Sequence, residues 1–113
     1  MIDTSGFIGT QAYHRLSMFS TVATDGVKYF CETLGCFWLF DEMSQIALTH
    51  ENEDFIVFDV VAKDGKCSIR ATNGNYKEIA KRIINFTDLE EGVYKFYAQK
   101  SIPFTVIMLP SEY

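Results

Sequence analysis

The sequence has few of the residues that form disulfides, bind metals or restrict the backbone: among 113 residues there are three cysteines, two histidines and two prolines. The odd number of cysteines and the lack of C-x-x-C spacing argue against a disulfide framework and a recognisable zinc motif. We expect Cys31, Cys36 and Cys67 to be reduced and mostly buried. Since His14 and His50 lie on separate segments, we expect no metal and no cofactor.

Long hydrophobic runs are also missing. The longest uncharged apolar run, Cys36 to Phe40, is far shorter than the roughly 20 residues that cross a bilayer. The start, Met1-Ile2-Asp3, lacks the basic and apolar segments of a signal peptide. We therefore expect no membrane association and a cytoplasmic location. With 48% hydrophobic and 22% charged residues, the composition is that of one globular domain over residues 1–113.

Positive charge is scarce: 10 Lys and Arg against 15 Asp and Glu give a net charge of −5. This field repels phosphate, so nucleic acid is not the expected partner. In the second half, however, bases and aromatic residues interleave as on a sheet face that binds single strands. The acids between them argue against that alternative. The residues concerned are Arg70, Lys77, Lys81, Arg82, Lys95 and Lys100, with Tyr76, Tyr94, Phe96 and Tyr97.

The first clear element is a short helix after Thr24. Thr24 is a residue that can cap free backbone N–H groups, and Asp25 suits the positive end of the helix dipole. Gly35 is placed to end the helix in the left-handed conformation. Apolar residues follow at i, i+3, i+4 and i+7, which predicts an amphipathic helix: Val27, Phe30, Cys31 and Leu34.

A longer, more deeply buried helix is predicted over residues 36–50, with a strand at residues 36–40 as the alternative. At about 100° per residue, one apolar arc contains Leu39, Phe40, Met43, Ile46 and Ala47. Asp41, Glu42, Gln45 and Thr49 gather on the opposite side. Trp38 falls among these polar residues, so it is either covered by another segment or exposed for a partner.

The second half reads as strands. Phe55–Ala62 is apolar on both alternating faces, which predicts a central strand covered on both sides. Asp64-Gly65 predicts a hairpin turn, and residues 67–72 alternate as a strand with one wet face. Two more strands are expected at Val93–Ala98 and Phe104–Leu109.

Residues 75–86 carry conflicting signals. Tyr76, Ile79, Ala80, Ile83 and Ile84 keep helical spacing, whereas an Asn-Gly turn after a strand normally leads into another strand. The local pattern slightly favours a helix.

Several short strings together give the chain a family resemblance. They are Phe7-Ile8-Gly9-Thr10 with Tyr13-His14-Arg15, Thr24-Asp25-Gly26-Val27-Lys28-Tyr29, Trp38-Leu39-Phe40-Asp41 with Ser44-Gln45, Asn73-Gly74-Asn75, Thr87-Asp88, and Leu109-Pro110-Ser111-Glu112-Tyr113. In this order they resemble a family of small uncharacterised proteins met in bacterial genomes, plasmids and phages. The resemblance implies an α+β domain with two N-terminal helices packed on an antiparallel meander of about four or five strands. It favours a strand at residues 76–86 and implies no activity.

The candidate contact surface is the polar side of the second helix, with Trp38, Asp41 and Gln45. Tryptophan is a usual anchor where one protein grips another. The alternative, which we favour, packs Trp38 under the N-terminal arm that runs through Phe7, Ile8 and Tyr13.

We expect no catalytic residues. A Cys31 or Cys36 nucleophile beside His14 is conceivable, but a buried thiol is inert without an electropositive neighbour. Asp41 and Glu42 point about 100° apart and read as a solvated face.

The resulting expectation is a non-enzymatic interaction domain of phage or plasmid type, which binds a protein partner or a second copy of itself as a homodimer. Two alternatives stay open. One is an acidic, anti-CRISPR-like inhibitor of host nucleic-acid machinery, whose carboxylates imitate phosphates. The other is a small enzyme with Cys or His chemistry.

Overall fold

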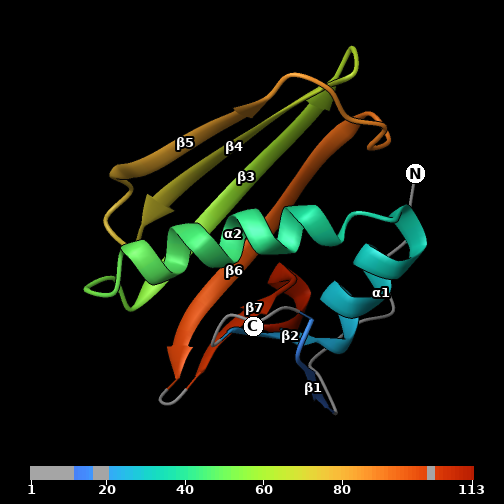
Figure 1. Cartoon of the computed structure of the whole chain (residues 1–113). Helices are drawn as coiled ribbons and strands as arrows, with labels where there is room; N and C mark the ends of the chain where they lie inside the picture. Colours follow the sequence, from blue (N-terminus) through green and yellow to red (C-terminus); the bar gives the residue numbers. More distant parts are fainter. Residues whose placement is uncertain (1–11, 17–20, 102–103) are drawn as a thin grey trace.

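The computed structural model describes residues 12–16, 21–101 and 104–113, which form a two-layer α+β fold (Figure 1). Two helices pack on one face of a seven-stranded sheet. The helices are α1 (Asp25–Leu34) and α2 (Phe37–Thr49), and a short 3₁₀ helix, η1 (Pro110–Glu112), ends the chain. The strands are β1 (Tyr13–His14), β2 (Thr21–Thr24), β3 (Phe55–Lys63), β4 (Lys66–Asn73), β5 (Glu78–Ile84), β6 (Gly92–Ser101) and β7 (Phe104–Met108).

The sheet is mixed, with the order β1-β2-β7-β6-β3-β4-β5. All neighbouring strands are antiparallel except β2 and β7, which pair in parallel from Thr21↔Thr105 to Ala23↔Ile107. The predicted antiparallel meander is therefore correct for β3–β5 and for the β6–β7 hairpin, but β6 pairs with β3 rather than with β5, and the whole sheet is mixed and has seven strands. The two extra strands come from the segments before α1, and β2 joins the start of the chain to its end.

The first helix forms as its sequence predicts. Thr24 is the N-cap and its hydroxyl accepts a hydrogen bond from the backbone N–H of Val27, while Gly35 ends the helix at φ 63°. Phe30 packs edge-on against the rings of Tyr94 and Phe96, both at 5.1 Å between centroids. The cap and the apolar stripe thus fix α1 against β6.

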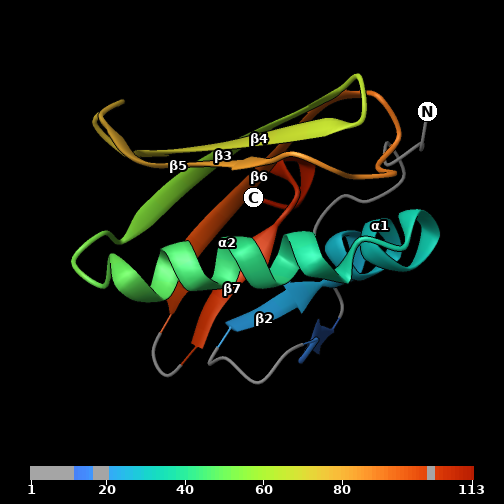
Figure 2. The ribbon, with the colours of Figure 1, turned by 45° about the horizontal axis from the view of Figure 1, so that its top comes forward.

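Helix α2 lies across the sheet, which curves so that β4 and β5 lie on one side of the helix and β2 and β7 on the other (Figure 2). Leu39, Phe40 and Met43 are fully buried against the strands. A buried pair of hydroxyls, Thr21 and Ser44 at 2.7 Å, joins β2 to α2. The helix predicted over residues 36–50 is confirmed, and the strand alternative at residues 36–40 is wrong.

Strand β3 is covered on one face only, so the prediction of a strand buried on both sides is wrong. Ile56, Phe58 and Val60 are buried under the helices, whereas Val61, on the opposite face, is 39% exposed. The apolar residues on that second face, Phe55 among them, are covered by neighbouring side chains rather than by another layer. Phe55 lies 5.1 Å from the ring of Tyr97 and 5.2 Å from that of Tyr113.

Two turns shape the β3–β5 meander. Asp64 and Gly65 adopt φ 54° and 72°, the left-handed values that the predicted Asp-Gly hairpin turn requires. At the next turn the left-handed residue is Tyr76, at φ 63°, and the Asn73 side chain accepts the backbone N–H groups of Asn75 and Lys77. The segment that follows is the strand β5. The strand that the family resemblance implies for residues 76–86 is therefore correct, and the helix that the local spacing favours is wrong.

Candidate protein-contact groove

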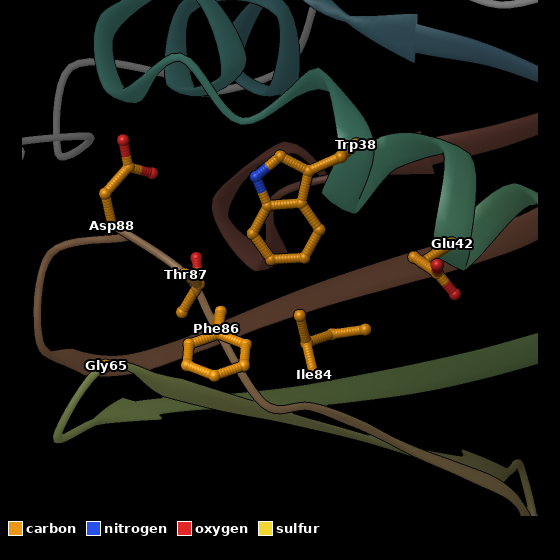
Figure 3. A pocket seen from close by; sticks show the side chains of 7 residues that line it. All are labelled: Trp38, Glu42, Gly65, Ile84, Phe86, Thr87 and Asp88. Carbon is orange, nitrogen blue, oxygen red and sulfur yellow. The ribbon is translucent and has the colours of Figure 1, made fainter.

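A shallow groove of about 710 Å³ lies between the first turns of α2 and the chain that leaves β5. Its walls are the Trp38 indole on the helix side, and Ile84 and Phe86 opposite (Figure 3). The remaining lining residues are Glu42, Gly65, Thr87 and Asp88. The groove is thus mainly apolar, with two carboxylates and no lysine or arginine.

The two aromatic walls differ in burial. Trp38 is partly buried and packs against the hydrophobic core, whereas Phe86 is 92% exposed. A phenylalanine this exposed keeps most of its apolar surface in water, at a cost of about 2 kcal/mol relative to a buried ring. Large exposed apolar side chains that lie together mark interaction sites in soluble proteins.

The loop that carries Phe86 is held in place by its backbone. The N–H of Thr87 donates to the carbonyl of Gly65 at 2.8 Å, and the N–H of Leu89 donates to the Thr87 hydroxyl at 3.1 Å. Leu89 itself is buried in the core. Phe86 therefore projects from an anchored segment of chain, so its exposure follows from the fold.

Arg82 does not line the groove but binds one of its lining residues, Glu42. Its guanidinium bonds to the Glu42 carboxylate and to Gln45 Oε1, the latter at 2.9 Å, and so ties β5 to α2. Glu42 is therefore paired, whereas Asp88 makes no ion pair with any residue the structure describes. The free negative charge of the groove lies at the Asp88 end, toward which the indole nitrogen of Trp38 is turned (Figure 3).

The three predicted contact residues are not equivalent. Trp38 lines the groove, and Gln45 is exposed beside Arg82. Asp41 is partly buried, and its Oδ1 has no hydrogen-bond partner in the described part of the chain. The interpretation of Asp41 and Glu42 as a solvated face holds in part: both side chains are partly exposed, but Asp41 Oδ1 is buried and Glu42 is paired with Arg82.

Of the arm residues expected to cover Trp38, Phe7 and Ile8 lie outside the described residues. Tyr13 lies in β1, where it pairs with Thr24 at the edge of the sheet and is 62% exposed. Phe86 was missed at the sequence level. It ends an ambiguous stretch, and its exposure depends on where the turn at Gly65 holds the loop.

The basic and aromatic sheet face, the disfavoured alternative, forms only in part: Arg70, Tyr76, Lys95 and Tyr97 line one hollow on the open face of the sheet, and the other residues concerned do not line it. Tyr94 and Phe96 are buried under the helices, and Arg82 points to α2. On the open face, Arg70 pairs with Glu78 at 2.8 Å and Lys95 with Asp59 at 3.7 Å. The positive charges there are largely balanced by neighbouring carboxylates.

The three cysteines are free and buried, as predicted. The pKa of Cys31 is raised, first by its hydrogen bond to Cys36 and then by burial, and burial raises the pKa of Cys67. His14 is paired with Asp25 at 2.7 Å, and the described residues contain no cluster of three metal-ligating side chains. Neither described helix is long and apolar enough to cross a membrane.

The fold and the groove thus define a small α+β domain with an open junction between a helix and the sheet. The model of a family of unknown function, DUF6876, matches residues 3–113, and the chain belongs to this family. None of the curated proteins compared with the chain matches it.

One similar solved structure is described as the crystal structure of the protein of unknown function from Enterococcus faecalis. It shares 19% sequence identity and a TM-score of 0.60, over 90% of this chain and 98% of that one. At this identity the likeness shows the fold alone. The expected membership of a family without assigned function is confirmed.

Proposed function

We propose that this chain is a non-enzymatic protein-binding domain, of the accessory type found in phages and plasmids, and that it binds its partner through the Trp38–Phe86 groove. The observation that carries the proposal is the 92% exposure of Phe86 on an anchored loop, opposite the partly buried Trp38. Aromatic side chains at the centre of an interface supply most of its binding free energy. The groove offers two of them within one apolar surface.

The two alternatives have less support. An acidic inhibitor needs a continuous run of free carboxylates, but Glu32, Glu42, Asp59 and Glu78 are each paired with a lysine or arginine. A Cys–His enzyme needs an accessible thiol, and the described cysteines are buried.

The test is a quantitative affinity capture from cells of the natural host, with the wild type, Phe86→Ala and Tyr76→Ala as baits. Tyr76 is 90% exposed in the turn between β4 and β5 and does not line the groove, so it controls for the loss of one exposed aromatic ring. We expect a partner retained by the wild type and Tyr76→Ala and lost with Phe86→Ala. Equal retention by all three baits would contradict the proposal.

A further inference from the structure

We infer that the partner inserts an arginine or lysine side chain into the groove, between the Trp38 indole and the Asp88 carboxylate. This inference rests on the proposed function, because it names the chemistry of the protein segment that the groove receives.

Charge is the first argument. The groove is lined by Glu42 and Asp88 and by no basic residue. Arg82 neutralises Glu42, which leaves Asp88 as the lining charge without an ion pair among the described residues. The chain as a whole carries a net charge of −5. A cationic group is therefore attracted from a distance and finds one unpaired carboxylate on arrival.

The aromatic wall is the second argument. Tryptophan is the side chain whose ring face attracts a cation most strongly. Figure 3 shows the indole with Asp88 beyond one edge and Glu42 beyond the other. A cation over this ring would lie close to a carboxylate as well, so the two attractions add.

The apolar walls are the third argument, because a small cation would leave them uncovered. Arginine and lysine carry the charge at the end of a long methylene stem that packs along apolar surface while its head stays near water. Ile84 and Phe86 supply that surface, and Asp88 supplies the polar end. The combination fits a long basic side chain better than a purely apolar one.

The experiment uses Trp38 as its own reporter, since it is the single tryptophan of the chain. The full-length protein is titrated with the peptide acetyl-Gly-Leu-Arg-Leu-Arg-Gly-amide, and with the same peptide carrying citrulline in place of arginine. Citrulline keeps the shape of arginine and removes its charge. Trp38 emission is followed at low and at physiological salt.

We expect the arginine peptide to bind roughly tenfold more tightly than the citrulline peptide, as a cation–π contact and an ion pair together predict. Asp88→Asn removes the ion pair and keeps the Trp38 ring, so it should reduce this preference to about threefold. Glu51→Gln removes an exposed charge beyond the other end of α2 and should preserve the preference within about twofold.

The outcomes separate the inference from the proposed function. If both peptides bind equally and Phe86→Ala weakens the binding of both, the groove binds peptides as proposed, but the inference that it receives a basic side chain is wrong. An undiminished tenfold preference in Asp88→Asn would also overturn the inference. If alanine at Phe7 and Ile8 shifts Trp38 emission without any peptide, the chain's own first residues fill the groove and both proposals fail.

Discussion

The hydroxyl of Thr24 donates a hydrogen bond of 2.6 Å to Oε1 of Glu112, a residue 88 positions later in the chain. The same carboxylate accepts the backbone N–H of Gly26 at 3.1 Å and that of Leu109 at 3.1 Å. It therefore lies at the N-terminus of α1, where the free N–H groups and the helix dipole favour a negative charge. The C-terminal segment thus completes the cap of the first helix.

Removal of this carboxylate should destabilise the fold. We expect Glu112→Ala to lower the free energy of unfolding by about 1 to 2 kcal/mol, because it removes a helix cap contact and three hydrogen bonds. Urea denaturation followed by circular dichroism measures the change. Ser111→Ala, at an exposed neighbouring position, is the control and should stay within about 0.5 kcal/mol. Equal stability of the two variants would contradict the capping role.

A side chain at position 26 should destabilise the fold, for a steric reason. A Cβ there would lie 2.6 Å from both Glu112 Oε1 and Leu109 Cδ1. We expect Gly26→Ala to cost about 1 to 3 kcal/mol, even though alanine favours helices. Gly74→Ala is the matched control, because a Cβ at Gly74 meets nothing within 4 Å. A thermal melt in which the two variants lose stability equally would show that the contact is not tight.

The fold should weaken at alkaline pH. Burial and the neighbouring Glu90 charge raise the pKa of Tyr94 above its ordinary 10.0, and burial raises the pKa of Cys67 above 9.0. These groups lose their protons first in the unfolded chain. Their contribution to stability is therefore complete below about pH 9 and falls as the pH rises further.

Melting temperatures between pH 7 and pH 11, under reducing conditions, measure this slope. Tyr94→Phe removes one of the groups and should make the decline above pH 10 shallower. Tyr113→Phe is the control, since Tyr113 is 72% exposed and should leave the slope unchanged. If the melting temperatures of the wild type and Tyr94→Phe fall equally with pH, the ionisation of Tyr94 does not cause the alkaline loss of stability.

The pair between Arg82 and Glu42 should stabilise the fold more than an exposed pair does. Its side chains are 33% and 27% exposed, whereas those of Arg70 and Glu78 are 51% and 45% exposed. In double-mutant cycles with Arg→Met and Glu→Gln, we expect a coupling of about 1 kcal/mol for the first pair and less than about 0.5 kcal/mol for the second. The reverse order would show that Arg82 does not hold β5 to α2.

The sequence predicted elements whose signals are local. Helix α1 follows from Thr24, Gly35 and the apolar spacing between them, and the Asp64-Gly65 turn follows from the φ values it requires. The parallel pairing of β2 with β7 has no such signal, because it joins residues 84 positions apart, such as Thr21 and Thr105.

Strand β5 shows how tertiary context overrides a local pattern. Its isoleucines keep helical spacing, but the Asn73 side chain organises a turn that returns the chain beside β4. The register shift in that pairing, between Ala71 and Thr72, breaks the simple alternation that would have identified a strand.

The candidate site could be predicted only in part, because one of its aromatic residues has a local signal in the sequence and the other has none. Trp38 stands out because its position on the wheel conflicts with its hydrophobicity. Phe86 gives no such signal, since its exposure depends on the path of a loop that is held by a long-range contact, the hydrogen bond from Thr87 to Gly65. A groove built from two distant segments becomes visible only when the fold places them together.

The central claim, that the Trp38–Phe86 groove is the surface through which this domain binds another protein, is tested most directly by photo-crosslinking in the native host. Benzoylphenylalanine replaces Phe86 in one variant and Tyr76 in the other, both at exposed positions. We predict a discrete covalent adduct from position 86, absent from position 76 and lost when Trp38→Ala is added. Adducts of the same pattern from both positions, or none from position 86 while position 76 reacts, would contradict the account.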